Sequence, residues 1–271
     1  MTLQDDRPEG RSYRFSHALC RAPAPSVVDG LRAGNGPDPD FVTFRSEHAA
    51  YVSALEAAGA EVTVLEPLDG FPDSVFIEDD ALTIGNTAIL LRPGTPSRAQ
   101  EPAALAPDLE ERFETVMPLP GTGPVDGGDV LLTDDTASIG LSARTSRDGA
   151  QALGEVLGPL GYRTLVVETP PDILHFKTDC GLIGPNTVLA TERLASTGCL
   201  DGVEIVLVVP GEDPCANAIR VNDTVILSAG FPGTAAKLRA SGYTVTEVPT
   251  SQAALVDGGP SCMSLRFSPA V

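Results

Sequence analysis

The chain is short of several residue types and motifs, and each shortage excludes a class of protein. Among 271 residues there are two lysines, three histidines and five cysteines. The cysteines are odd in number, scattered and without any CxxC pair, so neither a disulfide framework nor a structural zinc site is indicated. No apolar run of about 18 residues is present and Met1–Ser16 is polar, so we expect a soluble, cytoplasmic protein.

Positive charge is also scarce, since the net charge is -19. This balance argues against a nucleic-acid partner, because phosphate binding needs a basic face. It suits a cationic small substrate, although simple solubility is the more common reason for such a charge. No linker or low-complexity tract interrupts the chain, so we expect a single domain over residues 1–271.

A short hairpin-like phrase recurs four times, at residues 84–90, 133–139, 184–190 and 221–227. Each copy has a turn dipeptide flanked by β-forming residues, which is a hairpin signal. A polar residue stands seven or eight positions before the turn threonine in every copy. These residues are Asp79, Asp129, Asp179 and Asn217. The repeat predicts a pseudo-symmetric fold that directs polar groups from equivalent positions towards one centre.

Segments with helical periodicity lie between the hairpins, at residues 42–58, 103–116, 149–160 and 234–240. Short strands follow at residues 62–65, 165–167 and 245–248. With an N-terminal unit and a last strand near Cys262, the chain divides into about five strand-strand-helix-strand units. The irregular stretch at residues 32–40 is rich in Gly and Pro, and it is either a surface connection or a mobile lid.

Cys262 lies between a Gly/Pro bend and a predicted strand at residues 263–267. A thiol held at such a bend is well placed for nucleophilic attack, although buried cysteine also commonly serves as a small hydrophobic side chain. His175 lies just before the third repeat position, so a Cys and a His from related units could meet at the centre. We interpret His17, in a predicted edge strand, and His48, on a helix, as structural.

Asp126 belongs to the segment Val125-Asp126-Gly127-Gly128-Asp129, at the head of a predicted strand. Paired glycines permit a close backbone approach or an unusual dihedral angle, or they simply form a tight turn. If Cys262 and His175 form a site, Asp126 can orient His175 and stabilise its charge.

Charged residues of both signs could bind a ligand that has a cationic end and a carboxylate end. Carboxylates bind a guanidinium through paired hydrogen bonds, and arginines bind a carboxylate in the same way. Each residue taken singly could equally be a solvated surface charge. They are Asp73, Glu78, Asp79, Arg98 and Arg144. Together they favour an arginine derivative.

Six motifs resemble the dimethylarginine dimethylaminohydrolase family in order and spacing. They lie at residues 72–79, 92–98, 126–131, 140–145, 174–177 and 256–262. The resemblance implies the pentein fold, an α/β propeller of five ββαβ units around a central channel. It also implies cofactor-free hydrolysis of an Nω-methylated L-arginine to L-citrulline and methylamine or dimethylamine, through a covalent thiouronium.

The resemblance assigns roles residue by residue. It implies that Cys262 is the nucleophile, His175 the general acid/base and Asp126 the acid that orients it. The implied substrate-binding residues are Leu31, Asp73, Glu78, Asp79, Arg98, Arg144 and Val256, and Asp257 is expected to help hold the substrate nitrogens. A site rich in carboxylates disfavours a thiolate, so we expect little thiolate at Cys262 before a cationic substrate binds.

Some residues depart from the family pattern, namely Gly259-Pro260-Ser261 before Cys262 and Asp179-Cys180 after the histidine motif. They leave open whether the substrate is monomethyl, dimethyl, hydroxylated or unmodified arginine. An arginine deiminase, an amidinotransferase and a non-catalytic pentein binding protein are the alternatives. We expect no resting metal site, no membrane partner, and a monomer or homodimer.

Overall fold

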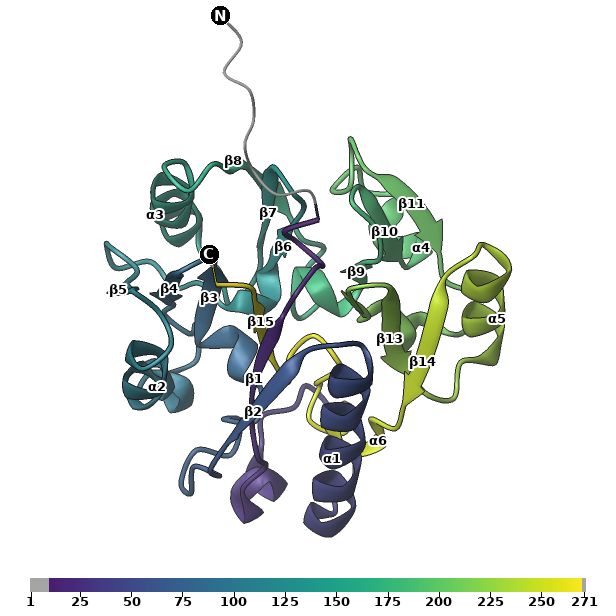
Figure 1. Cartoon of the computed structure of the whole chain (residues 1–271), viewed down its shortest axis with the longest axis horizontal. Coiled ribbons are helices and arrows are strands. Elements are labelled where there is room, and N and C mark those ends of the chain that lie inside the picture. The colour runs from purple at the N-terminus through teal and green to yellow at the C-terminus, as the bar shows by residue number, and fades with distance from the viewer. Residues whose placement is uncertain (1–9, 270–271) are drawn as a thin grey trace, which may run out of the picture.

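The computed structural model describes residues 10–269, and its strands form five three-stranded sheets arranged in a ring (Figure 1). In four of the sheets an antiparallel hairpin is followed by a strand parallel to its second member. These sheets are β3 (Ala81–Ile84), β4 (Thr87–Leu90) and β5 (Thr115–Pro118); β6 (Val130–Leu132), β7 (Thr136–Leu141) and β8 (Arg163–Glu168); β9 (Cys180–Leu182), β10 (Thr187–Ala190) and β11 (Glu204–Leu207); and β12 (Ile219–Val221), β13 (Thr224–Ser228) and β14 (Thr244–Val248). The predicted pentein propeller is confirmed.

Four of the helices connect a hairpin to its parallel strand, one connects β1 (His17–Arg21) to β2 (Glu61–Leu65), and one precedes the last strand. The longer helices lie on the outer rim of the ring (Figure 1). The helices are α1 (Phe41–Ala57), α2 (Glu101–Glu110), α3 (Arg147–Leu157), α4 (Glu192–Ala195), α5 (Pro232–Ala240) and α6 (Ser251–Ala254). Among the described residues, none of these helices has the length and apolar character needed to cross a membrane.

The fifth sheet joins the two ends of the described chain. It contains β1 (His17–Arg21), β2 (Glu61–Leu65) and β15 (Leu265–Phe267), in the order β15-β1-β2. His17 pairs with Phe267 on one side and with Glu61 on the other. The prediction that His17 lies in an edge strand is therefore wrong, because β15 returns from the far part of the sequence and covers that edge.

All four predicted hairpins are present, with turns that use the left-handed backbone conformation where the sequence allows it. Gly85 has φ 53° and Asn222 has φ 55°, in the turns before β4 and β13. The predicted helix at residues 103–116 was too long at its C-terminal end. It ends at Glu110 because Thr115–Pro118 pairs with β4 in parallel, and that pairing requires extended backbone.

The repeated polar position connects neighbouring units of the ring. The Asp79 carboxylate accepts a hydrogen bond from Gly128 N at 2.8 Å, and the Asp129 carboxylate accepts one from Phe176 N at 2.8 Å. The Asn217 amide oxygen accepts one from Ser261 N at 2.9 Å. Each of these bonds joins the turn that precedes the first strand of one unit to the corresponding turn of another unit.

Asp179 differs from the other three because it binds Arg193 and Thr191 within its own unit. The expectation that four equivalent polar groups face one site therefore needs correction. Three of them hold adjacent units together through buried backbone N–H groups, which is why a polar side chain is retained at a buried position.

Candidate functional site

Asp126 and His175 form a buried pair at the turns that precede β6 and β9. Asp126 is fully buried, and its Oδ2 lies 3.0 Å from Nε2 of His175. Its other oxygen, Oδ1, accepts a hydrogen bond from Gly94 N at 2.6 Å, and its own N–H donates to Thr145 Oγ1. The carboxylate is thus fixed from two loops, and it holds the imidazole in one orientation.

The double glycine after Asp126 makes room for two neighbouring units. A Cβ on Gly127 would lie 1.9 Å from the carbonyl oxygen of Glu78. A Cβ on Gly128 would lie 2.8 Å from Nδ1 of His175 and 3.0 Å from Oδ1 of Asp79. The reason for these glycines is close approach between parts of the protein, which was one of the alternatives that the sequence left open.

His175 is surrounded by carboxylates that favour its charged form. Burial opposes protonation, but Asp79, Asp126 and Asp129 together outweigh it and raise the pKa of His175 to about 9. The imidazole therefore carries both protons near neutral pH, and it can donate a proton from one nitrogen while the other remains bonded to Asp126.

Cys262 lies in the loop between α6 and β15, and that loop is fixed at several points. Its carbonyl accepts a hydrogen bond from Glu78 N at 3.1 Å. The side chain of Asn217 lies with Nδ2 3.8 Å from the sulfur, and its Oδ1 accepts the N–H of the preceding Ser261. The hydroxyl of Tyr51 donates to the carbonyl of Pro260 at 2.7 Å. The thiol is held by backbone and amide contacts, and Cys262 is half-buried.

The electrostatic surroundings of Cys262 suppress its thiolate. Burial, reinforced by the charges of Glu78 and Asp79, raises the pKa of the Cys262 thiol to about 11, although Lys177 opposes the rise. The same Asp79 raises the pKa of His175. The charges of Glu78 and Asp79 therefore raise the pKa of the thiol, and the charge of Asp79 also raises the pKa of the imidazole. Cys262, His175 and these two carboxylates thus form one electrostatic group.

One carboxylate oxygen of Glu78 forms ion pairs, and the other has no hydrogen-bond partner among the described residues. Its Oε1 lies 2.5 Å from Lys177 Nζ and 3.0 Å from Arg266 Nη2. Its Oε2 is buried and has no hydrogen-bond partner among the described residues. A buried unpaired acceptor is costly, so this oxygen is suited to a donor brought in by a ligand.

The guanidinium of Arg98 already has protein partners, so it is not free to bind a ligand. It is 3 % exposed, and its guanidinium donates to Asp79 at 2.6 Å, to Glu101 at 2.8 Å and to the carbonyl of Phe76 at 2.9 Å. Although burial opposes ionisation, His175 and Arg98 lower the pKa of Asp79 to about 2. Arg98 therefore keeps Asp79 ionised, and a ligand carboxylate would have to displace one of its present partners.

The other predicted substrate-binding residues form two groups. Arg144 is partly exposed, with Nη1 3.6 Å from Oδ2 of Asp126. The Asp73 carboxylate accepts the N–H of Leu31 at 2.9 Å, and a Cβ on the intervening Gly30 would touch both Asp73 and Val256. This second group therefore brings together three of the predicted residues from distant parts of the chain.

Asp257 attaches the irregular stretch at residues 32–40 to the loop that carries Cys262. Its exposed carboxylate accepts the N–H of Ala33 at 2.6 Å, and its backbone has φ 56°. Asp40 N in turn donates to Gln252 Oε1 at 2.7 Å. The stretch lies over this loop without regular structure, and whether it moves as a lid stays a prediction.

Sequence reasoning missed two residues of the site. Asn217 was recognised as a repeat position, but no pattern indicated that its amide would face a sulfur. Lys177 had a weak signal, since it is one of two lysines in the chain and directly follows the His175-Phe176 motif. Its pairing with Glu78 links two units that are far apart in sequence.

Asp79, Asp126 and His175 have ligand atoms within 4.8 Å of one another, so these residues could hold a metal ion. Each already has protein partners: Asp79 binds Arg98 and Gly128, and Asp126 binds Gly94 and His175. A histidine with a raised pKa is protonated at neutral pH and binds metal poorly. The arrangement is better suited to proton transfer than to a resting metal.

Comparisons with known proteins agree with this geometry. A family model described as N,N dimethylarginine dimethylhydrolase, eukaryotic, matches residues 42–192. The chain is 37% identical over 254 residues to the N(G),N(G)-dimethylarginine dimethylaminohydrolase of Pseudomonas aeruginosa, with 93% of this chain and 100% of the relative covered. It is 31% identical over 251 residues to the protein of the same name from Streptomyces coelicolor, with 92% and 96% covered.

Solved structures give the same result. A mutant of the Pseudomonas aeruginosa enzyme complexed with citrulline has a TM-score of 0.90 and 36% identity, with 94% of this chain and 100% of that chain covered. The N-terminal domain of ArgZ, a cyanobacterial arginine dihydrolase, has a TM-score of 0.82 but 20% identity, so it supports the fold alone.

Proposed function

The chain belongs to the N(G),N(G)-dimethylarginine dimethylaminohydrolase family, and we propose that it hydrolyses Nω-methylated L-arginine to L-citrulline and methylamine or dimethylamine. One observation carries the proposal beyond the family relationship. A half-buried thiol, a protonated histidine bonded to a buried carboxylate, and further carboxylates able to bind a cation lie in one electrostatic group.

The first half of the reaction is substitution at the guanidinium carbon. The Cys262 thiolate attacks this carbon and gives a tetrahedral adduct. His175 then donates a proton to the methylated nitrogen, the carbon–nitrogen bond breaks, and neutral methylamine or dimethylamine leaves. The substrate remains attached to sulfur as a thiouronium, and His175 is left neutral.

The second half uses His175 as a base. Neutral His175 takes a proton from water while the water oxygen attacks the same carbon. The resulting adduct collapses, the carbon–sulfur bond breaks, and L-citrulline leaves with the thiolate regenerated. Asp126 stabilises His175 each time it is protonated, and it keeps the ring in place for both transfers.

The substrate cation is attracted by Glu78 and Asp79, and the unpaired Oε2 of Glu78 is a natural acceptor for a guanidinium N–H. Arg144 can bind the substrate carboxylate without losing a strong partner, whereas Arg98 would have to exchange Asp79 or Glu101 for it. We assign the amino acid end of the substrate to the neighbourhood of Leu31, Asp73 and Val256, with Asp257 beside it.

The test is citrulline formation by the purified protein from monomethyl, dimethyl and unmodified L-arginine, compared by kcat/KM. We expect methylated arginine to be preferred. Cys262→Ser and His175→Ala should each lower kcat by about three orders of magnitude or more. Cys199→Ser is the matched control, because Cys199 is another partly exposed thiol that lies outside the site.

The proposal fails if the wild-type protein releases no citrulline from a methylated arginine, or if both variants retain activity. Preference for unmodified arginine would favour a deiminase instead. The cytoplasmic location and the monomeric or homodimeric state that the sequence suggested stay predictions.

A further inference from the structure

A cavity occupies the central channel, and it is lined by Glu78 but by none of Cys262, His175 and Asp126. Its volume is about 560 Å³, within the range of small-molecule sites. Its walls come from one strand of each sheet, namely β3, β6, β9, β12 and β15, and from the N-terminal segment Arg11–Phe15. Cys262, His175 and Asp126 precede these strands, so the cavity extends along the strands away from the candidate active site.

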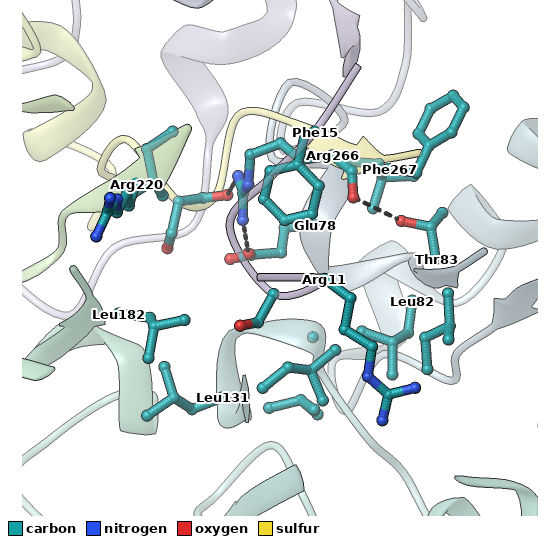
Figure 2. Close-up of a pocket in the computed structure, with 18 of the residues that line it drawn as sticks. Arg11, Phe15, Glu78, Leu82, Thr83, Leu131, Leu182, Arg220, Arg266 and Phe267 are labelled. Atoms are coloured by element: carbon teal, nitrogen blue, oxygen red, sulfur yellow. Dashed lines mark hydrogen bonds and ion pairs between the residues drawn. The ribbon is translucent and has the colours of Figure 1, made fainter. Parts of the chain in front are cut away.

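The ion-pair group around Glu78 forms part of the cavity wall. Lys177 and Arg266 both bind the same oxygen of Glu78, so this group has one negative and two positive charges. Arg266 Nη1 also donates to Ser264 Oγ and to the carbonyl of Ser261. Figure 2 shows Glu78 and Arg266 together in the middle of the view.

The lining is strongly basic for so acidic a chain. The charged side chains that line it are Arg11, Arg14, Lys177, Arg220 and Arg266, against one acid, Glu78. The chain as a whole has a net charge of -19. Five basic groups around one small cavity, with a single acidic group among them, create a local field that attracts anions.

Two of these arginines bind neutral groups, which leave their positive charge largely uncompensated. Arg11 donates to the carbonyls of Asp134, Leu160 and Gly161, and its guanidinium stacks on the Tyr162 ring at 3.8 Å. Arg220 donates to the carbonyls of Ile183 and Asn222 and stacks on Tyr13 at 4.3 Å. The nearest carboxylate to Arg220 among the described residues is that of Asp223, at 3.9 Å and largely exposed.

Apolar side chains make up much of the remaining lining, beside a few serine and threonine hydroxyls. In Figure 2, Leu182 lies at the left, Leu131 at the lower left and Leu82 at the right, while Phe15 lies in the upper middle. Arg11 and Arg220 lie on opposite sides of the view. A purely inorganic anion would leave these leucines facing water, and a neutral apolar molecule would leave the arginines without a counter-charge.

We propose that the channel is a second binding site, for a small organic anion with an apolar body, such as a medium-chain carboxylate or its phosphate counterpart. The anionic end pairs with the arginines, and the apolar body packs against the leucines. This inference goes beyond the proposed hydrolysis and does not depend on it.

Binding is measured on the full chain with 8-anilinonaphthalene-1-sulfonate, an aromatic anion whose fluorescence rises in an apolar site. We expect one probe per protein, affinity that falls as salt rises, and displacement by decanoate but not by decylamine or inorganic phosphate. Citrulline should not displace the probe, because it belongs to the candidate active site.

Two variants test the charge and the space separately. Arg220→Gln should weaken probe binding about tenfold, as expected when a charge-assisted contact is lost. Leu82→Trp keeps every charge and fills the cavity, so it should also weaken binding. Arg239→Gln removes the same charge on α5, outside the cavity, and should leave binding unchanged.

The proposal is overturned if decylamine or phosphate displaces the probe as well as decanoate does, or if citrulline displaces it. It is also overturned if Leu82→Trp, with an unchanged melting temperature, binds the probe as the wild type does. The result of the probe-binding experiment does not depend on whether the protein forms citrulline, so the two proposals can fail independently.

Discussion

The thiol of Cys262 should be almost entirely protonated until a cation occupies the site. With a pKa of about 11, the thiolate is about one molecule in a thousand at about pH 8, against about one in four for an ordinary cysteine. Each thiolate is more nucleophilic at the higher pKa, by about tenfold. Alkylation of Cys262 by iodoacetamide at this pH should therefore be about twentyfold slower than that of a free thiol.

A bound guanidinium should reverse this effect. A positive charge about 4 Å from the sulfur is worth about 4 kcal/mol at an effective dielectric constant of about 20, which corresponds to about three pKa units. The thiol pKa should fall from about 11 towards about 8 when such a ligand binds. Because substrate brings this charge, the nucleophile is produced mainly in the complex with substrate.

The assay is titration of the ultraviolet absorbance of the thiolate, with Cys262→Ser subtracted to remove the other four cysteines. The cationic ligand is an arginine analogue whose leaving nitrogen is replaced by a methyl group, so the amine that normally departs is absent. Citrulline is the matched control, because it has nearly the same shape without the positive charge. Equal titration midpoints with the two ligands would refute the reasoning.

Three further substitutions test the rest of the site. Asp126→Asn should lower the pKa of His175 from about 9 by about one unit or more, so the alkaline limb of the kcat/KM profile moves to lower pH. Gly128→Ala places a Cβ 2.8 Å from Nδ1 of His175, so kcat should fall about 100-fold while the melting temperature changes little. Arg98→Met should cost about 3–5 kcal/mol in urea unfolding, because it leaves buried carboxylates unpaired. Glu101→Gln should cost far less at neutral pH, since burial raises the pKa of Glu101 above its unfolded value and its ionisation opposes folding as pH rises.

Matched controls separate these effects from general ones. Asp69→Asn removes an exposed charge and should leave the pH profile unchanged. Gly36→Ala adds a methyl group where no atom lies within 4 Å, so kcat should not fall. An unchanged alkaline limb in Asp126→Asn, or equal unfolding free energies for the Arg98 and Glu101 variants, would contradict the roles given to these residues.

The hairpins could be predicted because turn chemistry and strand preference act over a few residues. The repeat also predicted the number of units, since four copies and one unit from the two ends of the chain make five. The helix at residues 103–116 was predicted too long, because local periodicity gives no sign that Thr115–Pro118 pairs with β4. Likewise, nothing near His17 indicated that β15 would cover β1.

The contact between Asp126 and His175 was predicted and is present, although its catalytic role stays a prediction. The spacing of Arg98 and Glu101 favours a local ion pair, but their association with Asp79 depends on the tertiary fold. Asn217 shows the same limit, because its partner Ser261 lies 44 positions away in sequence. Contacts between units follow from ring closure, which no local pattern encodes.

The sheet in which β15 completes β1 and β2 also determines when the protein becomes reactive. The loop with Cys262 precedes β15, so during synthesis the nucleophile leaves the ribosome after the four other sheets have been made. Until that strand docks, the histidine, the acid and the arginines are exposed to solvent without a thiol among them. A chain interrupted just before this loop would carry most of the fold without the nucleophile, so such a partial product of translation could not form the covalent intermediate.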